Sequence, residues 1–406
     1  MTLRAPSKSA IVPPASQTSG PSISDRTAIL QIIPRLETGG AERTTIDVAA
    51  ALVQSGYAAY VATKEGRMLD ELDDVGGQWI RFPAHSKAPH ALIANAFRLR
   101  DIVRERNIAL IHARSRAPAW SAFFAARMAK VPFVTTYHGI YNAKSGLKRF
   151  YNSVMARGDI VIANSEWTAQ HIVSEYRFKP KQLAVIPRGV DFARFDPAGV
   201  SMERVEALKR QWQAKPGETI VLLPGRLTRW KGQTILIDAL ARLKREGRLG
   251  AVRAVLAGDA QGRNTYEAEL RLQATSQGLD DRITIAGHVS DMPAAYLASD
   301  IVVSASTDPE AFGRVAAEAG AMERPVIATD HGGAREVIVN GTSGLLIPPG
   351  DSGALAEALS TLLAAGAERR EAMGKAARAH IATRYTVEKM CADTLALYQE
   401  LLAART

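Results

Sequence analysis

The feature that most constrains the fold is a repeated alternation of short, apolar, β-prone runs with longer stretches of helical periodicity. This alternation is the signature of βαβ units, which build parallel sheets covered by helices. It predicts strands in the first half of the chain at 28–34, 58–63, 79–82, 109–112, 133–136, 160–163 and 183–187. A second series follows at 219–223, 251–257, 283–286, 301–305, 326–329 and 344–347. The sequence therefore predicts an α/β protein with two doubly wound, Rossmann-like domains that face each other across a cleft.

The length of the chain agrees with two domains, because 406 residues exceed what one hydrophobic core usually serves. Residues 1–26 are Ser-, Pro- and Thr-rich and lack the apolar centre of a signal peptide, so we expect a disordered tail. The predicted domains span 27–190 and 191–385. In the remaining segment, 386–406, a helix from Val387 to Ala403 carries an apolar stripe and is expected to pack back toward the first domain.

The composition predicts a cytoplasmic protein. Apolar residues make up 47% of the chain and charged residues 23%, as in ordinary globular proteins. The single cysteine, Cys391, excludes an intramolecular disulfide and is typical of a reducing compartment. No run approaches the roughly 20 consecutive apolar residues that a membrane-spanning helix needs.

Positive charge is concentrated in one part of the chain. The net charge is +10, and residues 81–157 hold fourteen basic side chains but only two acidic ones, Asp101 and Glu105. Such a region favours an anionic partner, either nucleic acid, anionic lipid or a phosphorylated acceptor, although a solvated face that only aids solubility is the simpler alternative. We expect no nucleic acid, because the region lacks aromatic residues at stacking spacing and any known binding motif. The basic residues are Arg81, Lys87, Arg98, Arg100, Arg104, Arg106, Arg114, Arg116, Arg127, Lys130, Lys144, Lys148, Arg149 and Arg157.

The strongest functional signal is the segment Glu310-Ala-Phe-Gly-Arg-Val-Ala-Ala-Glu318. Because a predicted strand precedes it, Glu310 falls on a loop at the carboxyl end of that strand, and Glu318 lies about two turns farther along the next helix. The backbone N–H groups of Phe312 and Gly313 suit an anion or sugar hydroxyls. Each carboxylate can accept hydrogen bonds from a pair of vicinal hydroxyls, one pair on a hexose and one on a ribose. The spacing alone is equally consistent with a helix that bears solvated acids.

A basic loop, Gly225-Arg-Leu-Thr-Arg-Trp-Lys-Gly232, follows the first predicted strand of the second domain. Arg226 and Lys231 are placed there to hold a diphosphate and to offset the charge that builds on a leaving group. A solvent-exposed basic loop is the alternative.

The first domain offers a matching set of strand-end residues. The pair Gly39 and Gly40, after the first strand, lets the backbone approach phosphate, with a plain tight turn as the alternative. No G-x-G-x-x-G occurs here, which disfavours an NAD enzyme.

His138 ends the fifth strand and is expected to face the cleft, although a lone histidine is more often a packing residue. Ser165 and Arg188 follow later strands and are candidates for the acceptor side, with an N-cap and a hinge-side turn as their alternatives.

Two further features concern the second domain. The turn at 330–336 joins a strand to a helix beside the Glu310 loop; Gly332 and Gly333 leave room for a nucleotide, and Glu336 is as well explained as a surface acid. The sequence has neither a His/Cys cluster at zinc spacing nor a strand-end D-x-D motif, so we expect no metal and no cofactor.

Taken together, these residues resemble family-four retaining glycosyltransferases, which have the GT-B fold. The resemblance rests on the E-x7-E pair Glu310 and Glu318, on Arg226 with Lys231, and on three first-domain motifs: Gly39-Gly40, His138-Gly139 and Ile186-Pro-Arg-Gly-Val-Asp191. It covers roughly residues 27 to 400. Members often have Asn where Arg188 stands, which puts local acceptor contacts in doubt.

The resemblance implies roles for these residues. Glu310 would contact the hydroxyls of the donor hexose and Glu318 the ribose, while Arg226 and Lys231 would hold the diphosphate. His138 would contact the donor sugar near the reaction centre. The amides of Phe312 and Gly313, with Gly39 and Gly40, would frame the phosphates and the sugar. Such enzymes are thought to retain anomeric configuration by same-face attack, so Glu310 is not expected to be a nucleophile.

Resemblance and charge together give a sharper hypothesis. The enzyme would extend a lipid-linked or phosphorylated glycan, as in lipopolysaccharide or cell-surface polysaccharide synthesis, with its basic region peripheral to the anionic inner leaflet. A nucleotide-sugar 2-epimerase of the same fold and a non-catalytic nucleotide-sugar-binding protein are the alternatives. The oligomeric state does not follow from the sequence.

Overall fold

The structure is a computed structural model that describes residues 26–37, 39–86, 88–141, 145–176, 180–262 and 264–404. The tail expected at 1–26 lies outside the described residues except for Arg26. Lys87 and Lys144 of the basic region also lie outside them.

In the described residues, the first domain is built on a seven-stranded parallel sheet with the order β3-β2-β1-β4-β5-β6-β7. Each predicted strand of this half is confirmed, with ends that shift by a residue or two. The strands are β1 (Ala28–Ile32), β2 (Ala58–Thr63), β3 (Gln78–Arg81), β4 (Ile108–Ala113), β5 (Phe133–Tyr137), β6 (Ile160–Ala163) and β7 (Leu183–Val185).

The second domain repeats this plan with a six-stranded parallel sheet of order β10-β9-β8-β11-β12-β13. Its predicted strands are confirmed as well. They are β8 (Thr219–Pro224), β9 (Val252–Ala257), β10 (Ile283–Gly287), β11 (Ile301–Ser304), β12 (Val326–Thr329) and β13 (Gly344–Ile347).

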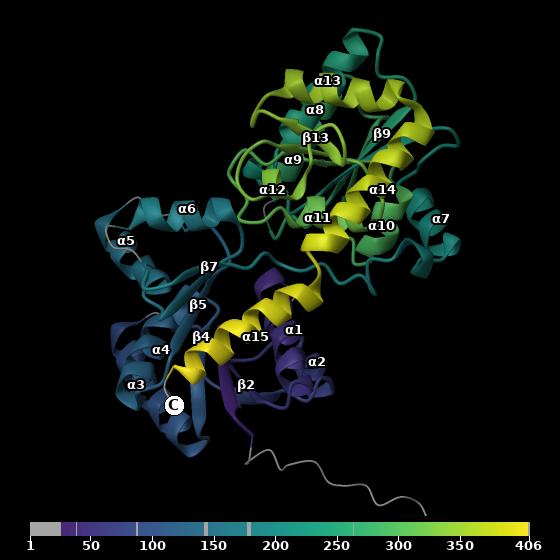
Figure 1. Cartoon of the computed structure of the whole chain (residues 1–406). Helices are drawn as coiled ribbons and strands as arrows, with labels where there is room; N and C mark the ends of the chain where they lie inside the picture. The colour runs from purple at the N-terminus through teal and green to yellow at the C-terminus, as the bar shows by residue number, and fades with distance from the viewer. Residues whose placement is uncertain are drawn as a thin grey trace, which may run out of the picture.

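Helices follow almost every strand and cover the sheets (Figure 1). In the first domain they are α1 (Gly40–Gln54), α2 (Leu69–Asp74), α3 (Pro89–Glu105), α4 (Arg116–Ala129), α5 (Gly146–Asn152), the 3-10 turn η2 (Ser153–Ala156) and α6 (Glu166–Glu175). In the second they are α7 (Met202–Gln211), α8 (Gln233–Arg245), α9 (Asn264–Ser276), α10 (Met292–Ala298), α11 (Arg314–Ala321), α12 (Ala334–Val337), α13 (Ser352–Ala364) and α14 (Gly366–Arg384). Short 3-10 turns η3 (Pro197–Gly199) and η4 (Arg229–Lys231) complete this half. Within the described residues, no helix combines the length and the apolar character needed to cross a bilayer.

Each sheet has a point where the strand order reverses, between β1 and β4 in the first domain and between β8 and β11 in the second. Ligands of open α/β sheets bind beyond the carboxyl ends of the strands at such a point. The motifs at Gly39-Gly40, at 225–232 and at 306–313 follow β1, β8 and β11, so all three lie at these reversal points.

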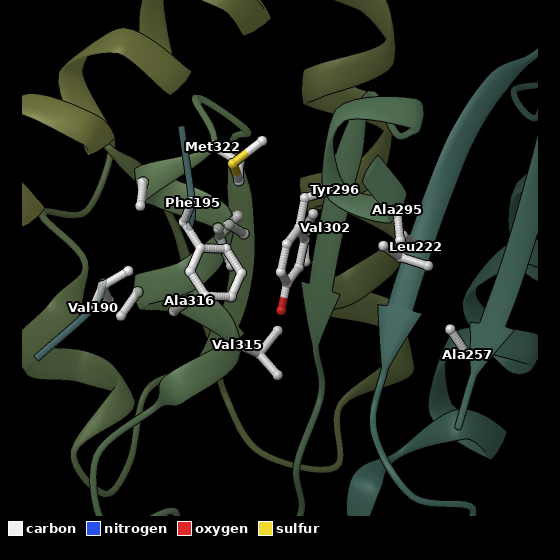
Figure 2. Close-up of a cluster of buried hydrophobic side chains, with 14 of the residues drawn as sticks. Val190, Phe195, Leu222, Ala257, Ala295, Tyr296, Val302, Val315, Ala316 and Met322 are labelled. Atoms are coloured by element: carbon white, nitrogen blue, oxygen red, sulfur yellow. The ribbon is translucent and has the colours of Figure 1, made fainter. Parts of the chain in front are cut away.

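Buried apolar side chains form a core on both faces of each sheet. Figure 2 shows one of these clusters in the second domain, where Phe195 and Tyr296 lie side by side with ring centroids 6.2 Å apart. Val190 and Phe195 of this cluster come from the segment that leaves the first domain, so the connection is packed into the second domain.

The chain crosses between the domains twice, and the two crossings run side by side. Val190 donates its backbone N–H to Tyr385 and accepts from Val387, forming a parallel bridge with Thr386. After this point helix α15 (Val387–Ala403) returns to the first domain, where Met390, Cys391, Leu395 and Tyr398 are buried against α1 and the sheet (Figure 1).

Candidate functional site

The loops that follow β8 and β11 meet through an ion pair between Lys231 and Glu310. The ammonium nitrogen of Lys231 lies 2.6 Å from Glu310 Oε1, and the Ser306 hydroxyl donates to the same oxygen at 2.5 Å. Both charged side chains are largely buried, at 13% and 12% exposed. Lys231 also lies over the ring of Trp230, with its nitrogen 4.4 Å from the centroid. The cation and the acid are therefore held in fixed positions before any ligand binds.

The protonation state of Glu310 follows from these contacts. Burial acts to raise the pKa of Glu310, but the charge of Lys231 and the hydrogen bonds from Lys231 and Ser306 outweigh it and lower the pKa. Glu310 is therefore an anion at neutral pH, able to accept hydrogen bonds and unable to donate one.

Glu318 lies two turns farther along the same segment, on α11, and is held by neighbours on both sides. The Tyr296 hydroxyl donates to Glu318 Oε2 at 2.9 Å, and Arg314 Nε lies 3.6 Å from Glu318 Oε1. The charge of Glu318 raises the pKa of Arg314, and Glu310 and Glu42, which belongs to the first domain, act in the same direction. Arg314 thus stands among carboxylates of both domains.

Glycines shape the backbone of this half of the site. Gly313 precedes α11 with φ +91°, and a Cβ there would lie 2.6 Å from Ala334 Cα. Gly232 precedes α8 with φ +76°, and a Cβ would lie 1.9 Å from the Ala305 carbonyl oxygen. Left-handed backbone packed this closely against a neighbouring turn leaves room only for glycine. Phe312, next to Gly313, is buried against the Tyr385 ring.

Arg188 and His138 lie together on the side of the site that the first domain provides, which we call the first-domain wall. Arg188 Nη2 donates to the His138 carbonyl oxygen at 2.9 Å and lies 3.2 Å from His138 Nδ1. A Cβ on Gly40 would lie 2.5 Å from Arg188 Nη1 and 3.9 Å from Arg314 Nη1, so the Gly39-Gly40 turn lies against cations of both domains. Burial, reinforced by Arg188, lowers the pKa of His138 well below its ordinary range, so the imidazole is neutral near pH 7.

Several polar atoms of this wall are buried without a hydrogen-bond partner in the described residues. They are His138 Nε2, Arg188 Nε and both amide atoms of Asn164. All three side chains line one cavity of about 10 Å³, which α15 closes with Met390 and Thr394. A polar cavity of this size accommodates about one water molecule.

Comparison with known proteins identifies the family. Residues 204–380 match the family Glycosyl transferases group 1, and residues 38–194 match Glycosyltransferase Family 4. The D-inositol 3-phosphate glycosyltransferase of Xylanimonas cellulosilytica is 30% identical over 311 residues, which are 73% of this chain and 73% of that protein. The chain belongs to glycosyltransferase family 4.

Solved structures of glycosyltransferases show the same GT-B architecture. A glycosyltransferase from Rickettsia africae matches with a TM-score of 0.84 and 33% identity over 93% of this chain and 99% of that one. HepE of Anabaena, solved in complex with UDP and glucose, matches with a TM-score of 0.79 and 27% identity over 92% of this chain and 100% of that one. The predicted fold and family are therefore confirmed.

The predicted site residues of this family 4 glycosyltransferase differ in how far the structure brings them together. Glu310 and Lys231 are in contact, and Gly40, His138 and Arg188 form one group. Arg226 is exposed, and no described side chain pairs with its guanidinium. Ser165 is buried and caps α6, accepting the Thr168 N–H at 3.0 Å, which is its predicted alternative. An acceptor role for Ser165 stays a prediction.

Sequence reasoning missed three side chains that hold the carboxylates. Arg314 was detectable, because it stands four residues before Glu318 on one helix face. Ser306 falls within a loop next to the predicted strand, but nothing in the sequence assigns its hydroxyl to Glu310. Tyr296 comes from a different helix, α10, and only the tertiary structure brings it to Glu318.

The basic region at 81–157 is less uniform than its sequence suggests. The expectation that Arg114 adds to a surface field is wrong, because Arg114 follows β4 at the reversal point, is buried, and donates to Gln31 Oε1. Arg127 and Arg149 pair with Asp159 and Glu175, acids that lie outside the region.

In the described residues, no three His, Cys, Asp or Glu side chains are grouped as a metal site.

Proposed function

We propose that this protein is a retaining, metal-independent hexosyltransferase that moves a hexose from a nucleoside diphosphate sugar to a glycan or lipid-linked acceptor. The observation that carries the proposal is the buried pair of Lys231 and Glu310, 2.6 Å apart at the carboxyl edge of the second sheet. One partner is a cation suited to a diphosphate and the other an anion suited to sugar hydroxyls.

In this proposal the second domain binds the donor. Glu310 accepts hydrogen bonds from the hexose and Glu318 from the ribose, with Arg226 and Lys231 on the diphosphate. The amides of Phe312 and Gly313 lie where α11 begins, at a place suited to phosphate or sugar oxygens. The solved complex of HepE with UDP and glucose supports a nucleotide-sugar donor, since HepE shares 27% identity with this chain.

The reaction then needs charge stabilisation of the leaving nucleoside diphosphate, which Lys231, held by Glu310, and the exposed Arg226 supply. His138, neutral and next to Arg188, contacts the donor sugar from the first domain. The acceptor attacks the same face from which the diphosphate leaves, and a phosphate oxygen takes the acceptor proton. This proposal assigns Glu310 to binding and not to nucleophilic attack, and its Oε1 is engaged by Lys231 and Ser306.

A donor panel tests this proposal. The protein is incubated with UDP-, GDP- and ADP-sugars in EDTA, with binding followed by thermal shift and products by NMR. We expect one nucleotide class to stabilise the protein and to give a glycoside or slow hydrolysis with the donor's anomeric configuration. A need for added metal or an inverted product contradicts the proposal. Release of a free epimerised sugar supports the epimerase, and binding without turnover supports a binding protein.

For the acceptor, the cationic character of the residues around it is the best guide. The relative from Xylanimonas cellulosilytica is named for D-inositol 3-phosphate, a phosphorylated acceptor. Arg188 and the buried Arg114 give the first-domain wall a positive character. The acceptor panel therefore contains D-inositol 3-phosphate and anionic lipid-linked glycans, the latter for a role in lipopolysaccharide or cell-surface polysaccharide synthesis.

We also propose that the first domain binds the anionic inner face of the membrane, which would make the enzyme cytoplasmic and peripheral. Exposed apolar side chains accompany the basic ones on the same helices: Phe124 on α4, and Leu147 and Phe150 on α5, the last two 80% and 59% exposed. Trp120 stacks on both Phe124 and Phe150, at centroid distances of 5.8 Å and 5.2 Å, which makes a continuous aromatic surface across α4 and α5. Apolar groups flanked by Arg and Lys suit the boundary between lipid head groups and acyl chains.

Vesicle flotation tests the membrane proposal. We expect binding to vesicles that contain phosphatidylglycerol, weaker binding at high salt, and little binding to pure phosphatidylcholine. Leu147→Glu combined with Phe150→Glu should abolish flotation. Leu272→Glu is the matched control, because Leu272 is equally exposed, at 71%, but lies on α9 of the second domain. Flotation that does not depend on lipid charge or on ionic strength contradicts the proposal.

A further inference from the structure

One acidic side chain of the second domain reaches across to the first. Glu336, on α12, accepts two backbone N–H groups from the start of α6: Glu166 N at 2.9 Å and Trp167 N at 2.7 Å. From sequence, Glu336 was equally well explained as a surface acid, yet both of its carboxylate oxygens are occupied by the other domain. Figure 1 shows α12 and α6 on the facing sides of the two domains.

The physical basis of this contact is the unpaired start of α6. The first N–H groups of a helix have no intrahelical acceptor, and the helix dipole places partial positive charge there. Ser165 satisfies the N–H of Thr168, and Glu336 satisfies those of Glu166 and Trp167. A carboxylate is the best acceptor for such a position, because its hydrogen bonds are charge-assisted.

A second contact ties the same turn of α6 to the Glu310 loop. The Thr168 hydroxyl donates to the Ala311 carbonyl oxygen at 3.1 Å. On the other side of this loop, Gly333 donates its N–H to the Glu310 carbonyl oxygen at 2.7 Å, and a Cβ on Gly332 would lie 2.4 Å from the same oxygen. The backbone that carries Glu310 is therefore held between the Glu336 turn and α6.

We propose that Glu336 and Thr168 form an interdomain clasp that places Glu310 for catalysis when the domains close. Glu336 is a positioning residue, because it acts through the Glu310 loop and not on substrate. α6 follows directly on β6 and on Asn164 of the first-domain wall, so the clasp joins the Glu310 loop to the wall that carries His138 and Arg188. The catalytic part of this inference rests on the proposed function; the closure part does not.

Glu336→Gln tests the clasp with little change in shape. The amide can accept from one N–H but presents its own N–H₂ to the other. We expect kcat for transfer to fall about tenfold, in keeping with the loss of a charge-assisted contact. The UDP dissociation constant should rise as well, because a nucleotide that compacts the wild type binds the closed form more tightly. In small-angle scattering, UDP should compact the wild type but not the variant.

Matched variants separate the clasp from simple stability. Thr168→Ser keeps the hydroxyl and should retain kcat, whereas Thr168→Val keeps the branched shape, loses the hydroxyl and should lower kcat. Asp330→Asn makes the same change in charge on the same turn, where Asp330 is 46% exposed and pairs with the neighbouring Arg335, and should leave kcat and compaction unchanged.

Three results would overturn the clasp: wild-type kcat and compaction in Glu336→Gln, a loss of thermal stability without loss of kcat, or equal effects from Glu336→Gln and Asp330→Asn. Should no donor support transfer by the wild type, the proposed function fails. A comparison of the wild type and Glu336→Gln by scattering, both without nucleotide, then still decides whether Glu336 holds the domains together.

Discussion

The two domains share one architecture but differ in how their partly or fully buried acids are held. In the second domain the buried acids are paired: Glu218 with Arg253 at 2.7 Å, and Glu310 with Lys231 at 2.6 Å. Buried polar atoms without a described partner occur in both domains, among them His138 and Asn164 in the first and Trp212 and His380 in the second, so the contrast lies in the acids. Asp47, on α1, receives no hydrogen bond from a described residue, and burial raises its pKa to about 7.

This difference bears on what each half does. Paired charges need little rearrangement and keep a site in shape before a ligand arrives. An acid without a partner is costly when it ionises, and it persists where a ligand, water or a moving neighbour completes it. The acids of the second domain are thus preorganised, whereas Asp47 of the first domain is not.

The largest effect should come from breaking the buried pair in the second domain. Arg253→Met leaves the Glu218 carboxylate, 7% exposed, without its partner. We expect the free energy of unfolding to fall by about 3–5 kcal/mol in urea denaturation, since a buried charge is left uncompensated. Arg271→Met is the control, because its pair with Glu267 is exposed and should contribute less than about 1 kcal/mol. If both variants lost the same free energy of unfolding, burial would not determine how much these ion pairs stabilise the protein.

The next effect concerns catalysis. Glu310→Gln removes the anion that we propose accepts hexose hydroxyls, and it leaves Lys231 without its counter-charge. We expect kcat/KM to fall about 100-fold, or roughly 2.7 kcal/mol of transition-state stabilisation. Glu203→Gln, on the exposed start of α7, makes the same chemical change and should have no effect. If Glu310→Gln kept full activity, Glu310 would not be part of the catalytic site.

The contrast between the domains also separates what the sequence predicts from what it does not. The thirteen strands of the described residues were predicted, because each is a short apolar run bounded by turn residues and needs no long-range information. The edge that carries the candidate site followed from the parallel order, so the strand-end positions of Glu310, Arg226 and Gly40 could be predicted, while their roles stay predictions. Contacts such as Glu336 with α6 join residues 170 positions apart. No local pattern records them, and the same is true of the interior position of Arg114.

The smallest effect tests the first domain, through Asp47. Its pKa is raised from 3.8 to about 7, first by burial, with Arg43 acting in the opposite direction. Between these two values the folded chain binds a proton that the unfolded chain does not, so folding stability falls as pH rises through this window, and the cost is complete above the folded pKa. Asp47→Asn removes a group that is costly when ionised. The variant should therefore be more stable than the wild type at about pH 8, and this advantage should shrink by about 2 kcal/mol toward about pH 5.

Thermal unfolding at the two pH values measures this difference, with Asp73→Asn on the exposed end of α2 as the control that should show no such dependence. Asn cannot act as a carboxylate. If Asp47→Asn lost activity without the pH-dependent gain in stability, Asp47 would be an acid that a ligand pairs. Asp47 would then belong with the paired acids of the second domain, and the contrast between the domains would fall. A gain in stability that follows the predicted pH course would instead show that the first domain keeps, at a measurable cost, an acid that no described residue pairs.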